Sequence, residues 1–334
     1  MTNAREYEGM PQHIELADRS DRVRLEITGP DRAKFLHNLT TNEIKRLVPG
    51  RGCESFVTSP QGKTIGYLIV LAADDRLMVR ADPNGVALAL PHLQKYGVFD
   101  DVSIEDRSSS TFELHFFGST APALAERLFD SPPRDDYAHL LAEIAGSPVR
   151  ITRESPTGRP GFSLIGEAEA AGPVREILFE RGRDLGLVEI DADAFEVLRI
   201  EAGTPVFGKD VTEKNLPQEF GRDDRAISFV KGCYLGQETV ARLDALGHVN
   251  QILKGLHIDA GCPVPSPGSP LESEGKRVGV ITSAAPWPDG KGFLGLAMIR
   301  TTHAKAGTRL TARLGEKAVA VEAIVCDLPI VHRA

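Results

Sequence analysis

The residues with the most distinctive chemistry lie in one segment, Lys231–Arg242, with the sequence KGCYLGQETVAR. Its cysteine, Cys233, lies between Gly232 and Gly236, which permit a tight loop or a close approach of the backbone to a ligand. Lys231 is two residues from the thiol, and a nearby cation or a helix N-terminus favours thiolate over thiol. The spacing leaves two interpretations open, a reactive thiolate and a small buried hydrophobic residue.

The patterns on each side of Cys233 predict the elements that position it. Ala226–Val230 is a short apolar run with β-branched and aromatic residues, which predicts a strand. Gln237–Leu243 begins with two side-chain acceptors and has the cation Arg242 near its end, a distribution that suits a helix dipole. We therefore expect a strand, a loop with Cys233 at its crest, and the start of a helix.

The composition limits the class of protein. The 334 residues carry a net charge of −8, so no surplus of cations is available for non-specific binding to nucleic acid or an anionic membrane. The four cysteines form no CxxC pair and the nine histidines show no metal-ligand spacing, so we expect no metal site. The N-terminus has no apolar signal segment and no apolar run approaches 18 residues, which predicts a cytoplasmic protein without a membrane span.

The order of elements predicts an α+β body followed by an all-β region. Arg22–Ile27 alternates as a half-buried strand, Thr40–Glu43 has residues that cap a short helix, and Asp191 caps a helix over Ala192–Ala202. From about residue 250 the chain is rich in Gly and Pro, and short β-like runs at regular spacing predict a small barrel. These runs are Leu253–Ile258, Arg277–Thr282, Gly292–Met298, Thr308–Ala312 and Ala318–Val325.

Several common catalytic templates are absent from the sequence. There is no GxxxxGK[ST] loop and no strand-linked GxGxxG, so nucleotide hydrolysis and dinucleotide binding lack their usual glycine cradles. There is also no HExxH and no GxSxG motif. Generic motifs therefore lead only to an α+β protein with one distinctive cysteine.

The Lys231–Arg242 segment resembles the signature of the YgfZ family, in which K-G-C-[YF]-x-G-Q-E is followed by Ala-Arg. YgfZ proteins bind folate and are linked to the assembly and repair of iron–sulfur clusters. They share their fold with the glycine-cleavage T-protein, a tetrahydrofolate-dependent aminomethyltransferase. The resemblance covers nearly the whole chain. It includes the segments Gly29–Leu36, Ser59–Lys63, Leu198–Gly203 and Val278–Ser283.

The resemblance implies an α+β, T-protein-like multi-domain fold. Residues 1–248 are expected to form two interleaved α+β domains that bind folate, and residues 249–334 a C-terminal β-barrel. Folate is expected at a central opening between the domains.

Three positions depart from the T-protein pattern. Gly66 and Tyr67 stand where aminomethyltransferases carry Asp-Asp, and neither side chain accepts a proton from a substrate amine near neutral pH. Ser163 stands where the T-protein carries a glutamate, so we expect the charge-assisted hydrogen bonds of that glutamate to be missing. Glycine-cleavage activity is therefore not expected.

The resemblance also gives the candidate site residues. Cys233 is the candidate reactive centre, and Lys231 either lowers its pKa or contacts an anionic ligand. The candidate folate-binding residues are Arg199, Glu201, Tyr234, Gln237, Glu238 and Arg242. Structural roles stay open for several of them: a solvated lysine, a packed tyrosine anchor, a helix cap at 237–238 and an ion pair between Glu238 and Arg242.

Three hypotheses of function follow. The first is a folate-binding protein that supports assembly or repair of iron–sulfur enzymes through Cys233, with assembly or client proteins as partners. The second is a one-carbon transferase, either an aminomethyltransferase or a folate-dependent demethylase. The third is a protein-binding scaffold without folate.

Overall fold

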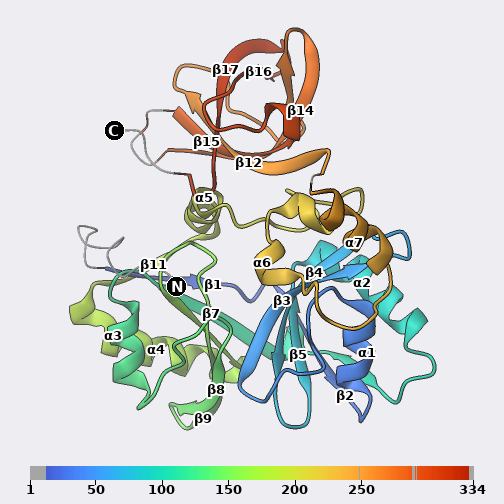
Figure 1. Ribbon diagram of the computed structural model, residues 1–334. Coiled ribbons are helices and arrows are strands. Elements are labelled where there is room, and N and C mark those ends of the chain that lie inside the picture. Colours follow the sequence, from blue (N-terminus) through green and yellow to red (C-terminus); the bar gives the residue numbers. More distant parts are fainter. Residues whose placement is uncertain (1–12, 248, 288–289, 291, 331–334) are drawn as a thin grey trace.

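The computed structural model describes residues 13–247, 249–287, 290 and 292–330, and it contains two open sheets and a closed barrel (Figure 1). The two sheets lie side by side, each with its own helices, and the barrel stands above them (Figure 1). The predicted α+β fold with a C-terminal β-barrel is confirmed.

The first sheet has five strands and is covered by helices α1 (Arg32–Leu39) and α2 (Pro83–Tyr96). In their order across the sheet the strands are β3 (Arg51–Thr58), β4 (Thr64–Ala72), β5 (Leu77–Ala81), β2 (Val23–Thr28) and β6 (Ser103–Asp106). β3 and β4 form the hairpin around the turn at 59–62.

The second sheet has six strands and is accompanied by helices α3 (Ala121–Leu128) and α4 (Ala171–Gly182). In their order across the sheet the strands are β11 (Leu187–Ile190), β1 (Ile14–Asp18), β7 (Thr111–Phe117), β10 (Gly161–Glu167), β9 (Ser147–Arg153) and β8 (His139–Ile144). β1 pairs in parallel with β11 and antiparallel with β7, so the first sheet is inserted between β1 and the rest of the second. This is the expected interleaving.

Three helices connect the sheets to the barrel: α5 (Ala192–Ala202), α6 (Asp223–Ala226) and α7 (Gln237–Leu246). The closed barrel has the strand order β12 (Gln251–Asp259), β15 (Gly292–Arg300), β14 (Lys276–Pro286), β13 (Pro270–Ser273), β16 (Arg309–Leu314) and β17 (Val319–Cys326). The predicted boundary at 248/249 stays a prediction, and residue 248 itself lies outside the described residues.

One apolar cluster joins the barrel to the rest of the molecule. Besides the separate cores of the two sheets and the barrel interior, buried residues from the first sheet, α5, α7 and the barrel pack together. They include Phe56, Ile200, Tyr234, Val240, Leu253 and Leu294. Apolar burial at about 25 cal/mol per Å² makes this cluster the main contact that fixes the barrel over the sheets.

Two predicted elements are wrong. The Ala226–Val230 segment is not a strand, and Thr40–Glu43 caps no helix. The reason is that the two segments bind each other: Thr41 Oγ1 donates to the carbonyl of Ala226 over 2.6 Å, and the amide of Ser228 donates to the carbonyl of Thr41 over 3.0 Å. These bonds use the backbone groups that a strand or helix would need.

Candidate functional site

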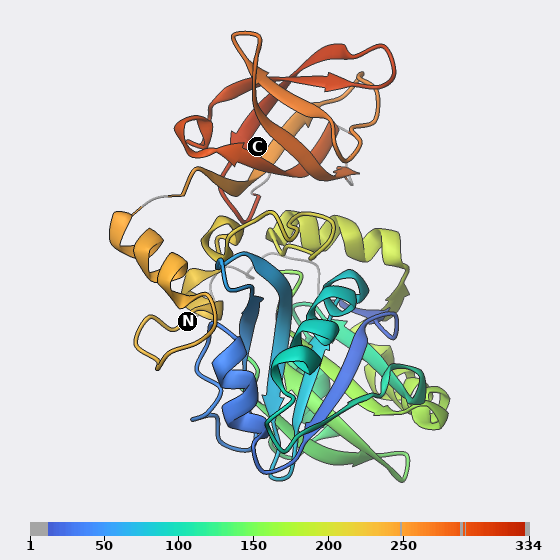
Figure 2. The same ribbon diagram turned by 90° about the vertical axis from the view of Figure 1, so that its right-hand side faces the viewer.

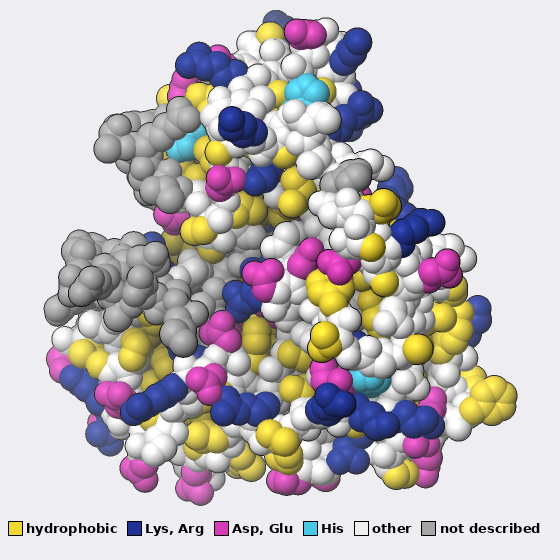
Figure 3. Space-filling view, viewed as in Figure 1, with side chains coloured by type: hydrophobic (Ala, Val, Ile, Leu, Met, Phe, Trp, Pro, Cys, Tyr) yellow, Lys and Arg dark blue, Asp and Glu magenta, His cyan; other side chains and the backbone are white. Residues whose placement is uncertain are grey.

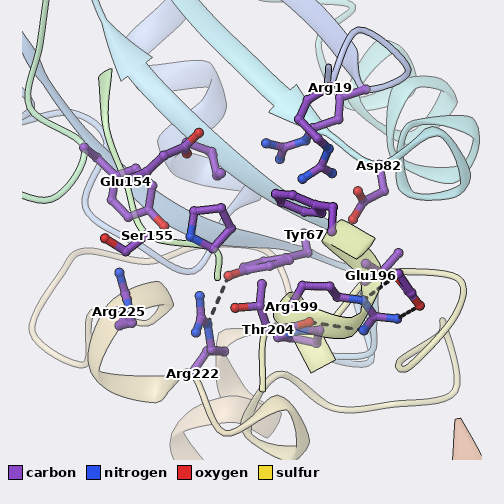
Figure 4. A pocket seen from close by; sticks show the side chains of 17 residues that line it. Arg19, Tyr67, Asp82, Glu154, Ser155, Glu196, Arg199, Thr204, Arg222 and Arg225 are labelled. Atoms are coloured by element: carbon purple, nitrogen blue, oxygen red, sulfur yellow. Dashed lines mark hydrogen bonds and ion pairs between the residues drawn. The ribbon is translucent and has the colours of Figure 1, made fainter. Parts of the chain in front are cut away.

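A cavity of about 720 Å³, open solvent included, lies between the two sheets and α5 and α6. Its polar lining side chains come from β4, from segments that adjoin the strands of both sheets, and from the region of α5 and α6 (Figure 4). They include Arg19, Arg22, Tyr67, Asp82, Tyr137, Glu154, Glu196, Arg199, Arg222 and Arg225. Figure 3 shows acidic and basic side chains gathered between the barrel and the sheets.

A fully buried carboxylate, Glu54, anchors one wall of this cavity. The hydroxyls of Tyr67 and Tyr137 each donate to it over 2.5 Å, and Arg222 Nη2 donates over 2.8 Å. Burial alone would raise the pKa of the Glu54 carboxyl, but Arg222 and Arg225 outweigh it and hold that pKa below its usual range. The wall is therefore a charged network whose members hold one another in place.

A second carboxylate, Glu154, lies at the end of β9. Arg80 binds it with both terminal nitrogens, over 2.9 and 2.8 Å, and the hydroxyl of Ser163 donates to it. His115 Nδ1 lies 3.0 Å from the same hydroxyl, and burial lowers the pKa of His115 to about 4. Ser163 stands where the T-protein carries a glutamate, but a carboxylate is still present at this place. Glu154, at the end of the neighbouring strand, supplies it.

Arg199 of α5 lines the cavity, but its guanidinium is occupied by protein groups. Its donors bind Glu196, Thr204 O, Asp210 and Ser283 Oγ, the last of these on barrel strand β14. Arg199 therefore links α5 to the barrel, which is a structural role beside the predicted folate-binding role.

Other groups at the cavity keep free hydrogen-bonding capacity. The terminal nitrogens of Arg19 have no hydrogen-bond partner among the described residues, and its guanidinium lies 4.1 Å from the ring centroid of Phe195. Nε of Arg22 is buried and also unpartnered in the described part of the chain. Asp82 accepts one long bond, 3.4 Å, from the amide of Phe207. Cationic donors and a carboxylate acceptor thus remain available to a ligand.

The hairpin positions 66 and 67 face different surroundings. A Cβ atom at Gly66 would lie 3.0 Å from Ala89 Cβ on α2, so a side chain there points at the helix. Tyr67 instead lines the cavity, and burial raises the pKa of its hydroxyl above its usual range. Its hydroxyl, already bonded to Glu54, does not ionise near neutral pH. Positions 66 and 67 therefore offer the cavity no general base.

Cys233 lies outside this cavity, on the loop before α7. It is exposed, and it borders a surface hollow together with Phe35, Asn38, Tyr96 and Leu235. The loop is tight because Gly236 has φ +85° and a Cβ there would lie 2.3 Å from the carbonyl oxygen of Ser59. Glycine at this position lets the cysteine loop pack directly on the turn of the β3–β4 hairpin.

Lys231 faces inward beneath this loop. Its Nζ donates to the carbonyls of His37, Thr40 and Asn42 over 2.6, 2.6 and 3.0 Å, and it lies 4.7 Å from the ring centroid of Tyr234. Burial lowers the pKa of Lys231 to about 8. Lys231 therefore ties the loop to the end of α1, and Tyr234 is a packed anchor. The predicted effect of Lys231 on the thiol stays a prediction.

The predicted helix after Gly236 is confirmed as α7. Gln237 is half-buried, whereas Glu238 and Arg242 are exposed. The N-cap of α7 has no side-chain hydrogen bond, and Glu238 and Arg242 form no ion pair. Glu201 lies on α5, where its backbone carbonyl accepts from Ile330 N over 2.7 Å. Of the six candidate folate residues only Arg199 lines the cavity, and the roles of the others stay predictions.

Sequence reasoning missed most of the residues that build the cavity. Glu54 and Arg222 are 168 positions apart, and Arg80 and Glu154 are 74 apart, so no local spacing could join them. The one usable signal was the polar residue inside an apolar strand, such as Glu54 within β3, since a buried charge requires a partner.

The fold and the cavity define a class of protein, and the comparisons with known proteins name it. Residues 2–231 match the GCVT N-terminal domain, and residues 252–331 match the glycine cleavage T-protein C-terminal barrel domain. The chain belongs to this GCVT family.

Relatives with assigned names support the same family. The chain is 29% identical over 96% of its length to a candidate chloroplastic transferase, At1g60990, of Arabidopsis thaliana, covering 72% of that protein. It is 29% identical over 88% of its length to the aminomethyltransferase of Streptomyces avermitilis, covering 80% of it. The crystal structure of the glycine cleavage aminomethyltransferase T from Bartonella henselae has the same fold, with a TM-score of 0.81 at 21% identity, covering 98% of this chain and 89% of that one.

Two further findings concern only the described residues. None of their helices is long and apolar enough to cross a membrane. Within the same residues, no group of three or more His, Cys, Asp or Glu side chains is arranged to hold a metal ion.

Proposed function

We propose that the central cavity binds tetrahydrofolate and that Cys233 is a second, separate functional group of the same protein. The observation that carries the first part is the free hydrogen-bonding capacity at the cavity: the terminal nitrogens of Arg19, Nε of Arg22, and the carboxylate of Asp82, which accepts one long bond in the described part of the chain. Aminomethyltransferases of this family use tetrahydrofolate as the one-carbon carrier, which supports the choice of ligand.

The chemistry of a reduced folate fits these groups. Its pterin carries adjacent N–H donors that a carboxylate such as Asp82 would accept. Its glutamate carries carboxylates, for which an arginine fork such as Arg19 is the preferred partner. The aromatic rings of Tyr67 and Phe195 offer surfaces for the flat parts of the molecule. When bound, tetrahydrofolate would supply a nitrogen pair that carries a one-carbon unit.

This chain's own residues would bind and orient the folate, but positions 66 and 67 would supply no acid or base. Tyr67 is held by Glu54 and Arg222, and Gly66 faces α2. General acid–base help typically accounts for about 10²–10⁴-fold in rate, so we infer that glycine cleavage is not the main activity.

We propose instead that the protein supports assembly or repair of iron–sulfur enzymes, as the resemblance of the Lys231–Arg242 segment to the YgfZ signature implies. The exposure of Cys233 on a loop fixed by Lys231 supports this role, because the thiol is accessible to a partner protein. Iron–sulfur assembly or client proteins are the partners in this proposal.

Complementation of a strain that lacks its own copy of this protein tests the role of the thiol. Cys233→Ala is expected to leave iron–sulfur enzyme activity at the level of the deletion strain. Cys262→Ala, a change at a partly exposed cysteine in the barrel region, is the matched control and should restore activity. Full rescue by Cys233→Ala would remove the cysteine from the proposal.

A second candidate function is one-carbon transfer, and the names of the relatives favour it. Purified protein incubated with tetrahydrofolate and an aminomethyl-loaded carrier protein, or an N-methyl amine, tests it. We expect no methylene-tetrahydrofolate above background. Steady formation of that product would establish the transferase and displace the iron–sulfur proposal as the main activity.

A further inference from the structure

A separate cavity lies where α6, α7 and the 3₁₀ turn Pro217–Phe220 meet the barrel. Its volume is about 650 Å³, open solvent included, and it shares no lining residue with the central cavity. Figure 2 shows α7 at the left of the molecule, with the barrel above it. None of the groups in this cavity takes part in the proposed folate or thiol chemistry.

Gln218 gives this cavity a fixed acceptor. The side chain is 7% exposed, and its Nε2 donates to the carbonyl of Val240 over 2.8 Å. Because a carbonyl only accepts, this bond fixes which end of the amide faces Val240. The other end, Oε1, is buried and has no hydrogen-bond partner in the described part of the chain.

Two aspartates add negative charge beside Gln218. Oδ1 of Asp223 is buried and has no partner among the described residues, and Asp244 lines the same cavity from α7. Burial, together with the carboxylates of Asp224 and Asp244, raises the pKa of Asp223 to about 6. No lysine or arginine is among the described residues that line the cavity, and the C-terminal end of α7 adds its negative dipole.

Leu243, Val249 and Ile252 give the cavity an apolar wall, and Thr301 lines it with a hydroxyl that donates to the carbonyl of Val249. We propose that this cavity binds a primary alkylammonium group. An ammonium carries three N–H donors, which match the three acceptor groups Gln218 Oε1, Asp223 and Asp244. Its aliphatic stem would lie against the apolar walls, as lysine stems do on protein surfaces. A free diamine and the side chain of a lysine share this chemistry.

A hydrated divalent metal fits the cavity less well. The described residues contain no group of three or more His, Cys, Asp or Glu side chains that could hold a metal ion, and the side-chain oxygens at this site are those of two carboxylates, one amide and the Thr301 hydroxyl. Ca²⁺ and Mg²⁺ take six or more oxygen ligands. The side chains of Leu243, Val249 and Ile252 would gain no favourable contact from a hydrated ion. The shape and chemistry of the walls therefore favour an organic cation.

Calorimetric titration of the full chain at constant ionic strength tests the proposal. The probes are 1,5-diaminopentane for a free amine and Nα-acetyl-lysine methylamide for a lysine side chain, with N-butylacetamide as a neutral control. We expect at least one amine to bind saturably and the neutral amide not to bind. The probe that binds more tightly identifies the source of the ammonium group.

Three variants make the test specific. Asp223→Asn is expected to weaken amine binding at least tenfold, and Asp244→Asn, at an exposed position, severalfold. Asp130→Asn, an exposed acid after α3, should bind like the wild type. Equal affinities of Asp223→Asn and wild type would overturn the proposal. So would saturable binding of MgCl₂ or CaCl₂, without amine binding, that Asp223→Asn abolishes.

Discussion

The central cavity and the cysteine loop differ in how their functional groups are held. At the cavity, Glu54 accepts hydrogen bonds from Tyr67 on β4, from Tyr137 just before β8 and from Arg222 just before α6. Arg199 binds groups on α5, a connecting loop and the barrel. At the loop, Cys233 is exposed and Val230 is 95% exposed, although Lys231 and the amide of Leu235 bind backbone carbonyls of α1 beneath them.

The difference separates two kinds of recognition. Buried, mutually bonded charges are fixed before a ligand arrives, which suits a small molecule that must be oriented. An exposed thiol beside exposed apolar side chains suits contact with a large partner, because no cavity wall limits access to it. We therefore expect stability and ligand binding at the cavity to depend on its buried charges. The reactivity of the thiol on the loop is expected to depend on its exposure.

The largest effect is expected at Glu54. Glu54→Leu leaves Arg222, Arg225 and two tyrosine hydroxyls without their acceptor, and breaking a buried charge network in this way costs about 3–5 kcal/mol. Urea unfolding followed by circular dichroism measures the loss in free energy of unfolding.

The matched control for this change is an exposed ion pair. Asp135→Ala breaks the exposed pair with Arg51, and pairs of this kind contribute about 0–1 kcal/mol. If both variants unfold at the same urea concentration, Glu54 does not anchor the cavity wall.

The reactivity of the cysteines comes next. Burial and the neighbouring Glu54 raise the pKa of Cys53 to about 12, so only about one thiol in 10⁴ is ionised at pH 8. Cys233 is exposed. We expect iodoacetamide to alkylate Cys233 at least 100-fold faster than Cys53, as peptide mass spectrometry over time would show. Comparable alkylation rates of the two cysteines in the folded protein would contradict the contrast between an accessible thiol on the loop and a protected thiol on β3.

A smaller effect is expected from pH. Between pH 6.5 and 4 the unfolded chain protonates His115 while the folded chain, with its pKa lowered to about 4, does not. Protons therefore favour unfolding in this window, and stability falls as the pH falls. Between pH 7.5 and pH 5, this histidine is expected to lower the free energy of unfolding by about 2 kcal/mol.

His115→Gln removes this titration and keeps a side chain able to bond Ser163. Urea unfolding at pH 7.5, 6 and 5 should show that the free energy of unfolding falls less with decreasing pH in the variant than in the wild type. If the free energy of unfolding falls equally with pH in both proteins, the second sheet tolerates a charged His115.

Much of the fold could be predicted from the sequence, because periodicity and caps are local. Asp191 was expected to cap α5, and its carboxylate accepts from the amide of Ala194 over 2.8 Å. The strand predicted at Ala226–Val230 was wrong because the backbone of this segment binds Thr41 and, among the described residues, no neighbouring strand. Ala226 and Ile227 are buried, whereas Phe229 and Val230 are exposed, and no local pattern shows where an apolar run leaves the core.

The cysteine loop and the central cavity also differ in how far they could be predicted from the sequence. Cys233 stood out because its motif is continuous in sequence. Glu154 did not, because its importance depends on Arg80 and Ser163, which reach it from other strands. A buried ionic network is a property of the folded chain, so spacing could not reveal it.

Calorimetry with tetrahydrofolate tests the central claim most directly, on wild type, Arg19→Met and Cys233→Ser. Arg19→Met keeps packing against Phe195 but removes the cation, and a lost charge-assisted hydrogen bond of about 1.5–3 kcal/mol weakens binding roughly 10- to 100-fold. Cys233→Ser should bind within about twofold of wild type, because the thiol lies outside the cavity. No binding by wild type, or equal losses in both variants, would contradict the separation of folate cavity and thiol.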